Sequence, residues 1–337
     1  MTTKVIESAC VYASFIVSDF NPAVLINQLP AATAGWQPAN PDVWRSYWSL
    51  YGFLPWLDEV QCDVQCLVEN GERVVMQRFA TPGKCRANVV VLHGYMDHVG
   101  LYGHLISDLL AQGLQVYSFD LPGHGLSGGE PYAIDTFGHY VDALERVLGQ
   151  VSPEGACTLI GQSTGGAIIL EHQRRHREPA RKIDQRILLA PLIRPAGFQS
   201  IRLRYQLMHL WLKRVRRFYS ENSHDERFLP FVRDQDPLAK HWISVRWIGA
   251  MLDWIRELEG ETLTLENGCV IQGTGDKTVD WQHNVLRLRT CVPAEAIHLV
   301  DGARHHLVNE APLWRQQVFA HIRARLANMQ AEAENTP

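Results

Sequence analysis

One stretch of this sequence decides the fold: Cys157-Thr158-Leu159-Ile160-Gly161-Gln162-Ser163-Thr164-Gly165-Gly166-Ala167-Ile168-Ile169-Leu170. An apolar run, a glycine-flanked serine and a second apolar run opened by small residues predict a strand, a sharp turn and a helix. The turn fits the pattern Gly-x-Ser-x-Gly, in which a serine sits on a strained strand-to-helix corner with its hydroxyl above the sheet. Glycines flank the serine because side chains there would collide with the neighbouring strand or helix. Ser163 is therefore a candidate nucleophile, and a chance match to a short pattern is the alternative.

Strands and helices alternate on both sides of this stretch. Short, continuous apolar runs at residues 87–92, 115–119 and 186–193 are typical of strands covered on both faces. Helical patterns at residues 102–112 and 134–148 separate the strands that precede the serine. An alternation of this kind predicts an α/β protein with a mostly parallel central sheet flanked by helices.

An antiparallel hairpin and two later strands complete the predicted sheet. Alternating residues ahead of the turn Asn70-Gly71, and a β-rich run at residues 74–79 after it, predict the hairpin. The sheet resumes at residues 269–272 and again at 296–300. A last helix is expected from about residue 311 to residue 329.

The chain divides into four predicted parts. Residues 1–60 carry four tryptophans and several prolines without a clear period, and we expect an N-terminal extension that packs on the core. Residues 61–193 and 261–329 are predicted to form the α/β core. Residues 194–260 interrupt the alternation, contain no convincing strand and are predicted to form a helical lid, or cap. The polar residues 330–337 are expected to be a loose tail.

Composition places the chain among ordinary globular proteins. With 337 residues, of which 46% are hydrophobic, it is long enough to bury a large core. A formal charge of -4 argues against a nucleic-acid-binding protein. Seven scattered cysteines and an N-terminus without a secretory pattern predict reduced thiols and a cytoplasmic protein. The apolar run at residues 9–17 is far shorter than the roughly 20 residues that span a bilayer, so no transmembrane helix is expected.

Two pairs of residues have spacings that could hold a metal ion. His172 and His176 lie four apart on the helix after Ser163, and Cys62 and Cys66 share one face of a strand. Neither pair has further ligands nearby at the spacing of a zinc site. We therefore expect structural or solvent-facing roles for these residues, and no metal site.

A serine hydroxyl is a poor nucleophile at neutral pH, so it needs a base within hydrogen-bond reach and a carboxylate that orients the base. Asp276 directly follows one of the later strands, and His305 follows the other after a short loop. The order Ser163, Asp276, His305 is the one expected when all three residues lie at carboxyl ends of strands in such a sheet. Asp280 and His306 are the nearest rivals for the roles of acid and base.

Acyl transfer also needs donors for the oxyanion that develops on the reacting carbonyl. Backbone amides suffice for this purpose. We expect one to be the amide of Thr164, directly after the nucleophile, and the other to be the amide of Tyr95, at the turn after His93-Gly94. His93 itself is predicted to brace the turn rather than to act in catalysis.

Five motifs follow one another along the chain: His93-Gly94-Tyr95-Met96-Asp97-His98 with Tyr102, Gly123-His124-Gly125-Leu126-Ser127-Gly128-Gly129, Gly161 to Gly165, Gly275-Asp276, and Gly302-Ala303-Arg304-His305. In this order they resemble the motifs of α/β-hydrolases, specifically of the group that holds monoacylglycerol lipases and bacterial lysophospholipases. The resemblance covers about residues 63–325.

This resemblance implies a mostly parallel sheet of about eight strands, no cofactor, and catalytic roles for Ser163, Asp276 and His305. In that family the first histidine after Gly-Ala-x is the base, which selects His305 over His306. The N-terminal 60 residues and the lid lie outside the well-matched part of the chain.

The predicted lid is both basic and apolar. Helical patterns cover residues 201–218 and 242–258, and no acidic residue occurs from 194 to 218. The first pattern interleaves apolar residues with six cations, namely Arg202, Arg204, Lys213, Arg214, Arg216 and Arg217. A basic amphipathic helix can lie on an anionic membrane surface, and the alternative is a lid helix packed on the core with solvated arginines. Nucleic-acid binding is not expected, because no module for it is recognisable.

These observations predict a serine hydrolase that cleaves carboxylic esters of single-chain lipids, monoacylglycerols or lysophospholipids, through an acyl-enzyme. Its partner is then a lipid-like ester, and contact with a membrane surface through the lid would make the cytoplasmic protein peripheral to the membrane. A small-ester carboxylesterase or an aminopeptidase could use the same three residues. Two non-catalytic alternatives are a binding protein that kept the hydrolase fold and a protein that acts through its basic lid.

Overall fold

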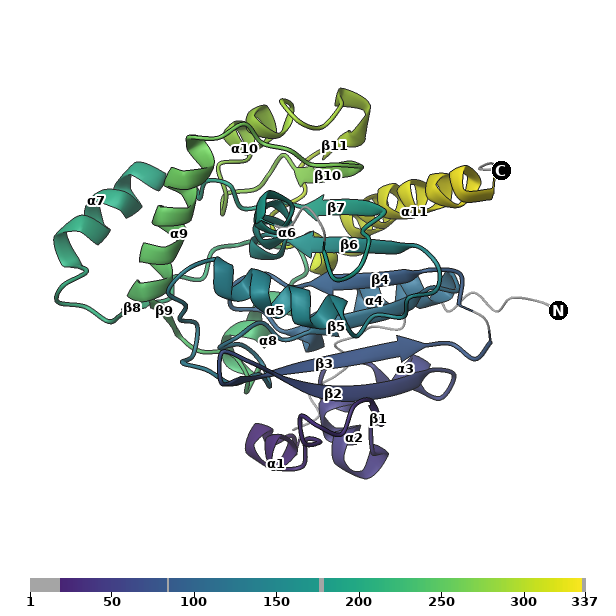
Figure 1. Cartoon of the computed structure of the whole chain (residues 1–337). Coiled ribbons are helices and arrows are strands. Elements are labelled where there is room, and N and C mark those ends of the chain that lie inside the picture. The colour runs from purple at the N-terminus through teal and green to yellow at the C-terminus, as the bar shows by residue number, and fades with distance from the viewer. Residues whose placement is uncertain (1–18, 84, 176–178, 335–337) are drawn as a thin grey trace.

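A long, mostly parallel sheet runs through the protein, and helices cover both of its faces (Figure 1). A computed structural model describes residues 19–83, 85–175 and 179–334. Over these residues the sheet has nine strands in the order β1-β2-β3-β5-β4-β6-β7-β10-β11. Their bounds are β1 Gln37–Pro38, β2 Gln61–Glu69, β3 Glu72–Ala80, β4 Asn88–Leu92, β5 Gln115–Phe119, β6 Cys157–Gln162, β7 Gln185–Leu189, β10 Gly268–Gly273 and β11 Ile297–Val300.

Eleven α-helices occur among the described residues. Their bounds are α1 Pro22–Asn27, α2 Pro41–Leu50, α3 Leu54–Leu57, α4 Gly103–Ala111, α5 Gly138–Leu148, α6 Thr164–Arg175, α7 Phe198–Met208, α8 Phe228–Asp234, α9 Val245–Glu259, α10 Trp281–Leu288 and α11 Pro312–Glu334. None of them is both long and apolar enough to span a membrane.

The predicted α/β class is confirmed. Strands β5, β4, β6, β7, β10 and β11 pair in parallel, and β1, β2 and β3 add an antiparallel edge. The continuous apolar run of β4 is explained by its two covered faces. Val89 and Val91 belong to one core cluster, together with residues of α4 and α11, whereas Val90 and Leu92 belong to the other, together with α5 and α6. A strand buried on both sides has no polar face to show in its sequence.

The hairpin of β2 and β3 forms at the predicted turn. Asn70 and Gly71 have φ values of 51° and 77°, which the paired strands need at a two-residue connection. Helices α1 to α3 lie beside this hairpin in Figure 1. Their aromatic side chains pack on it, for example Phe53 and Trp56 against Phe79. The described part of the N-terminal region thus adds to the core on this side of the sheet.

A buried polar link joins this N-terminal region to the body and to the lid. The Tyr51 hydroxyl donates to Asp236 over 2.8 Å, and His98 contacts the same carboxylate over 3.0 Å. Burial alone would lower the pKa of His98, but the charge of Asp236 raises it above its ordinary value. Burial would likewise raise the pKa of Asp236, but His98 and the Tyr51 hydroxyl hold it down. Three segments distant in sequence therefore meet at one ion pair.

The lid region differs from its prediction in one respect. Residues 194–260 contain α7, α8 and α9, but also two short strands, β8 Arg214–Arg216 and β9 Trp242–Ser244, which pair antiparallel. The expectation of no strand between 194 and 260 was therefore wrong, and the helix expected over 201–218 ends at Met208. Pairing between segments almost 30 residues apart leaves no local period, and arginine is a good helix former.

Three element ends also differ from the predicted ones. The strand expected over 186–193 ends at Leu189, because Ala190 has a φ of 43° that no strand accommodates. The helix expected from residue 134 begins at Gly138. The last helix runs to Glu334 rather than to Met329, so the segment expected to be a loose tail continues the helix, and residues 335–337 lie outside the described residues.

The corner between β6 and α6 has the geometry that its sequence predicts. Ser163 has a φ of 54°, a left-handed conformation that a non-glycine residue adopts only at some cost. A Cβ atom at Gly161 would lie 2.4 Å from the backbone of Gly165, and one at Gly165 would lie 2.4 Å from the carbonyl oxygen of Leu92. Both obstacles are backbone atoms of packed elements. Only glycine fits at these two positions.

We predict that Gly165→Ala destabilises the fold by about 1–3 kcal/mol, since the backbone of β4 cannot retreat without disturbing the sheet. Thermal or urea unfolding measures this change. Gly149→Ala is the matched control, because Gly149 has a φ of -64° and its nearest neighbour would be 3.5 Å away. That variant is expected to stay within about 0.5 kcal/mol of the parent protein. Equal stability of the two variants would contradict the steric argument.

Candidate active site

Three of the residues singled out in the sequence meet at the carboxyl edge of the sheet. The His305 Nε2 atom lies 3.0 Å from the Ser163 hydroxyl, and its Nδ1 atom lies 2.7 Å from Asp276. Ser163 is at the β6–α6 corner, Asp276 follows β10, and His305 follows β11. These strands run parallel in one part of the sheet, where β10 and β11 are neighbours and β7 separates β6 from β10, so their carboxyl ends lie at the same edge. The spacing is that of a hydroxyl, an imidazole and a carboxylate linked by hydrogen bonds.

Asp276 is held in place from three directions. Its Oδ1 accepts the amide hydrogens of Thr278 and Val279 over 2.8 and 3.1 Å, and its Oδ2 accepts the side chain of Gln272 as well as His305. Burial would raise the pKa of Asp276, but His305 and these donors lower it. Asp276 is therefore a fixed, charged partner for the imidazole.

The environment favours a proton on His305. Burial would lower the pKa of His305, but the charge of Asp276 and its hydrogen bond raise it above the ordinary value of 6.5. The rival acid, Asp280, serves elsewhere, since its side chain caps α10 by accepting the amide hydrogen of His283. A positive charge on this imidazole is stabilised by Asp276, as transfer of a proton from serine requires.

The rival histidine, His306, pairs with a different carboxylate. His306 contacts Asp97 over 3.1 Å through its Nε2 atom, and Asp97 also accepts the Tyr102 hydroxyl over 3.0 Å. The ring of His306 packs edge-on against Phe228. Burial would raise the pKa of Asp97, but His306 lowers it strongly. The adjacent residues His305 and His306 thus pair with two different carboxylates. The pair of His306 and Asp97 was not predicted from the sequence.

The two residues expected to supply amides line the same cavity as the serine. Tyr95 and Thr164 both border it beside Ser163. The side chain of Tyr95, for which no role was predicted, stacks on Trp247 with ring centres 3.7 Å apart, and its hydroxyl accepts the amide hydrogen of Ser244. This turn is therefore fastened to the lid as well as to the sheet.

His93 braces that turn, as the sequence predicts. Its Nε2 accepts the amide hydrogen of Leu121 over 2.9 Å, so its Nδ1 carries the proton and donates to the Gly94 carbonyl over 2.7 Å. Burial lowers the pKa of His93, in keeping with a neutral ring. Both nitrogens are occupied by the backbone, which leaves none for a substrate.

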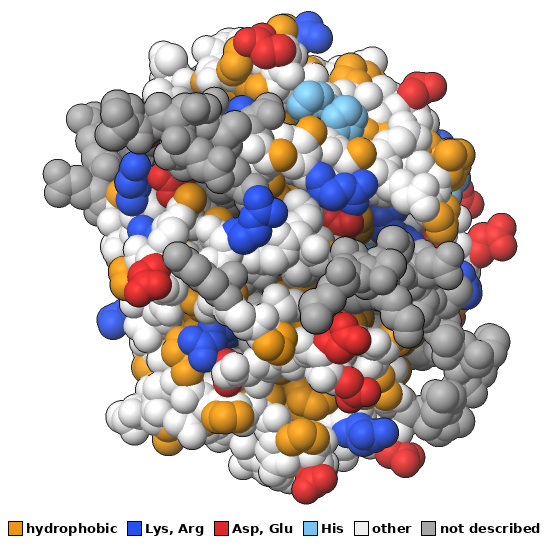
Figure 2. Space-filling view, turned by 90° about the vertical axis from the view of Figure 1, so that its right-hand side faces the viewer, with side chains coloured by type: hydrophobic (Ala, Val, Ile, Leu, Met, Phe, Trp, Pro, Cys, Tyr) orange, Lys and Arg blue, Asp and Glu red, His pale blue; other side chains and the backbone are white. Residues whose placement is uncertain are grey.

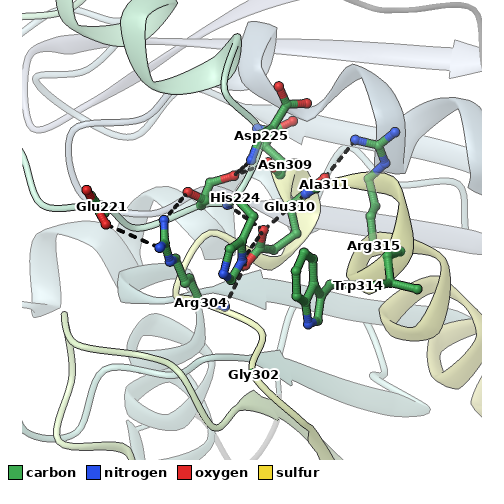
Figure 3. Close-up of polar contacts among 12 residues, drawn as sticks. Glu221, His224, Asp225, Gly302, Arg304, Asn309, Glu310, Ala311, Trp314 and Arg315 are labelled. Carbon is green, nitrogen blue, oxygen red and sulfur yellow. Dashed lines mark hydrogen bonds and ion pairs between the residues drawn. The ribbon is translucent and has the colours of Figure 1, made fainter.

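The loop that carries His305 is clamped to the lid by Glu310, a buried residue that the sequence did not single out. Figure 3 shows the cluster. The carboxylate of Glu310 accepts the amide hydrogens of Arg304, His224 and Ala311, and it also contacts the His224 ring over 3.0 Å. His224 in turn stacks on Trp314 with ring centres 4.0 Å apart. One fully buried carboxylate thus organises both chain segments.

Arg304 strengthens the same clamp from the other side. Its guanidinium donates to the Ser223 carbonyl over 2.8 Å and forms an ion pair with Glu221 over 3.2 Å (Figure 3). The amide of His306 donates to the Asn222 carbonyl over 2.8 Å. Residues on both sides of His305 are therefore tied to lid residues 221–225.

The cavity above Ser163 has a volume of about 560 Å³ and is lined mainly by apolar side chains. Its wall combines the carboxyl edge of the sheet with the lid. Lid residues that face it include Ile201, Met208, Leu212, Phe218, Val232, Ile243 and Met251. A cavity of this size and character holds a small or medium-sized apolar ligand.

The residues considered as metal ligands do not come together. Among the described residues, no three His, Cys, Asp or Glu side chains form a group that could hold a metal ion. His172 is buried and contacts Glu145, and His176 lies outside the described residues. Cys62 and Cys66 are buried on β2 and form no disulfide.

We predict that Glu310→Gln destabilises the protein by about 3 kcal/mol, because the new amide group would face backbone donors at a buried site. Urea unfolding measures the loss. Glu221→Gln is the matched control, since the Glu221 side chain is 81% exposed and forms its ion pair with Arg304 at the surface. That change is expected to cost no more than about 0.5 kcal/mol. A Glu310→Gln protein as stable as the control would show that the clamp contributes little.

Comparisons with known proteins agree with this geometry. The family model described as serine aminopeptidase, S33, matches residues 83–312. A stretch of 109 residues, 32% of this chain, is 31% identical to the monoacylglycerol lipase of Mycolicibacterium smegmatis (strain ATCC 700084 / mc(2)155), and covers only 39% of that lipase. The monoglyceride lipase of Rattus norvegicus is 26% identical over 77% of this chain and 89% of its own length.

A solved structure of similar fold gives the same picture. A soluble variant of monoglyceride lipase from Saccharomyces cerevisiae, in complex with a substrate analog, matches 79% of this chain and 94% of its own chain with a TM-score of 0.67 at 19% identity. The likeness concerns the fold. The family match extends over more than half of the chain. This chain therefore belongs to the serine aminopeptidase S33 family of α/β-hydrolases, in its monoacylglycerol lipase-like group, and is a carboxylic ester hydrolase.

Proposed function

We propose that this hydrolase cleaves carboxylic esters of single-chain lipids, monoacylglycerols or lysophospholipids, through an acyl-enzyme formed on Ser163. One observation carries the proposal. The line of two hydrogen bonds from Asp276 through His305 to Ser163 ends inside an apolar cavity of about 560 Å³. The chemistry of acyl transfer and the space for an acyl chain thus occur at the same place.

In the proposed mechanism, the Ser163 hydroxyl attacks the ester carbonyl while His305 Nε2 takes its proton. The amides of Tyr95 and Thr164 donate to the oxyanion of the tetrahedral intermediate. His305 then passes the proton to the leaving alcohol, and the acyl group remains on Ser163. Water attacks the acyl-enzyme with His305 again as base, which releases the fatty acid. Asp276 keeps the His305 ring oriented and stabilises its positive charge.

The lining of the cavity favours a lipid ester over a peptide amide as the substrate. An aminopeptidase needs a carboxylate to bind the free amino group of its substrate. Among the residues that line the cavity, the acidic one is Asp97. Its carboxylate already accepts hydrogen bonds from His306 and Tyr102. The mainly apolar wall is suited to an acyl chain instead. Several relatives carry names of monoacylglycerol or monoglyceride lipases, which agrees with this choice.

We also propose that the lid contacts a membrane surface, where such lipids reside. Large apolar side chains are exposed there: Leu203, Leu207, Met208, Leu210, Trp211 and Phe218. Exposed cations lie among them. The opposite face of the molecule mixes basic, acidic and apolar side chains where it is drawn in colour (Figure 2). Apolar side chains flanked by cations favour insertion into the headgroup region of an anionic bilayer.

We predict that Ser163→Ala lowers the rate of ester hydrolysis by about 10⁴-fold or more, because no other group can form the acyl-enzyme. Initial rates are measured on acyl glycerols and lysophospholipids of graded chain length. Ser200→Ala, at an exposed position on α7, is the control and is expected to keep full activity. An unchanged rate in Ser163→Ala would show that Ser163 is not the nucleophile. Activity on short esters alone would favour the small-ester carboxylesterase.

We predict that kcat/KM falls as the pH drops through a midpoint above about 6.5, because protonated His305 cannot act as base and its pKa is raised. Asp276→Asn should lower kcat/KM by about 10⁴-fold and move the midpoint to lower pH, since the charge that raises the pKa is gone. A series of rate measurements from about pH 5 to about pH 9, which brackets the ordinary pKa of histidine, measures both effects. Asp280→Asn is the control and should change neither. A midpoint that stays in place in Asp276→Asn would contradict the assigned role.

A further inference from the structure

Six cations of the lid have no acidic partner. Arg202, Arg204, Lys213, Arg214, Arg216 and Arg217 form no ion pair with the described residues, and no acidic residue occurs in the sequence from 194 to 220. Arg214 instead stacks on Trp242, and Arg217 stacks on Tyr219 with the guanidinium carbon 4.6 Å from the ring centre. The local excess of positive charge is therefore not neutralised within this part of the protein.

Arg217 is one of three of these cations that line the cavity above Ser163, together with Arg204 and Arg216. It follows β8, and side chains alternate between two faces along a strand, so it lies on the same face as Val215, which also lines the cavity. Its amide donates to the His241 carbonyl over 3.0 Å, which fixes the backbone beside β9. Arg202 and Arg214, by contrast, are exposed and do not line the cavity.

The guanidinium of Arg217 is incompletely satisfied. Its Nη1 atom is buried and has no hydrogen-bond partner among the described residues. A buried donor of this kind is costly unless a ligand pairs with it. Burial raises the pKa of the Tyr95 phenol, and the positive charge of Arg217 is one of the influences that oppose the rise.

The cavity offers no carboxylate to neutralise this cation. Of the described acidic residues, Asp97 is the one whose side chain borders the cavity, and it is occupied by His306 and Tyr102. Arg204, His209 and Arg216 also reach the lining. The charged side chains on the lid side of the cavity are thus basic, and the wall as a whole is mainly apolar.

We propose that the substrate carries an anionic phosphate in its headgroup, and that Arg217 binds this phosphate while the ester lies at Ser163. The inference rests on the proposed function and narrows it, since it favours acyl glycerol phosphates and other anionic lysophospholipids over neutral monoacylglycerols. A planar guanidinium pairs with two phosphate oxygens at once, and Tyr219 holds its plane by stacking. The guanidinium then gains a charged partner that a neutral glycerol headgroup replaces poorly.

The test compares two substrates with the same acyl chain, 1-lauroylglycerol and 1-lauroylglycerol 3-phosphate, both below their critical micelle concentrations. The parent protein should show the higher kcat/KM for the phosphate. Arg217→Gln should lower kcat/KM for the phosphate by about 10-fold or more, through KM, and change the value for 1-lauroylglycerol by less than about 3-fold. Arg202→Gln removes the same charge from an exposed position and should preserve the preference. A preference for the neutral ester in the parent protein, or an equal loss on both esters in Arg217→Gln, would overturn the proposal.

Binding to the Ser163→Ala protein separates this inference from the proposed function. Calorimetry with 1-lauroylglycerol 3-phosphate should show an affinity that falls by about 10-fold when Arg217→Gln is added. If neither ester is hydrolysed but this loss is observed, the proposed reaction fails while the anion site stands. Equal affinity with and without Arg217 overturns the site. Glycerol 3-phosphate should compete only at concentrations well above those of the lipid, and competition as strong as that of the lipid would overturn a site built for a lipid headgroup.

Discussion

Backbones touch at the β6–α6 corner, and the position of the Ser163 hydroxyl depends on that contact. Cβ atoms at Gly161 and Gly165 would each lie 2.4 Å from main-chain atoms, so the first turn of α6 lies directly against the ends of β4 and β6. Ser163 adopts a left-handed φ of 54° at this corner, which is an energetically costly conformation for a residue other than glycine. In return its hydroxyl stands at the edge of the sheet, where the loops after β10 and β11 bring Asp276 and His305. The constraint is steric, and it involves the five residues 161–165 and the end of β4.

The groups around that corner are secured by buried ionic contacts. Asp236 joins α2, the turn after β4 and the lid, and Glu310 joins the loop of His305 to lid residues 221–225. Each carboxylate is buried and accepts several hydrogen bonds, the arrangement in which a buried charge is tolerated. Both link segments far apart in sequence. Geometry at Ser163 is therefore maintained by contacts that are themselves remote from the reacting atoms.

The sequence predicted the α/β class, the corner and the order of the three site residues, because each leaves a local or ordered signal. The apolar run of β4, the turn at Asn70-Gly71 and the glycines around Ser163 are steric or periodic features of a few residues. Strands β8 and β9 were missed, since their pairing joins residues 214–216 to 242–244. Glu310 gave no signal either, because its partner His224, which donates its backbone amide and also contacts the carboxylate through its ring, lies 86 residues away in the sequence. Asp97 belongs to the motif at residues 93–98, but its pairing with His306 depends on the tertiary fold.

The clamp at Glu310 divides the lid into two halves with different freedom. Segment 221–239 is fastened to the body at both ends, by Glu310 and Arg304 at one end and by Asp236 at the other. The preceding part, residues 197–220 with α7 and β8, carries most of the exposed apolar side chains, and in it α7 packs on α9 while β8 pairs with β9. Its attachments are therefore to other lid elements, whereas the loop of His305 is attached to residues 221–225. A displacement of residues 197–220 would break the pairing of β8 with β9 and leave the lid contacts of Arg304, His306 and Glu310 in place.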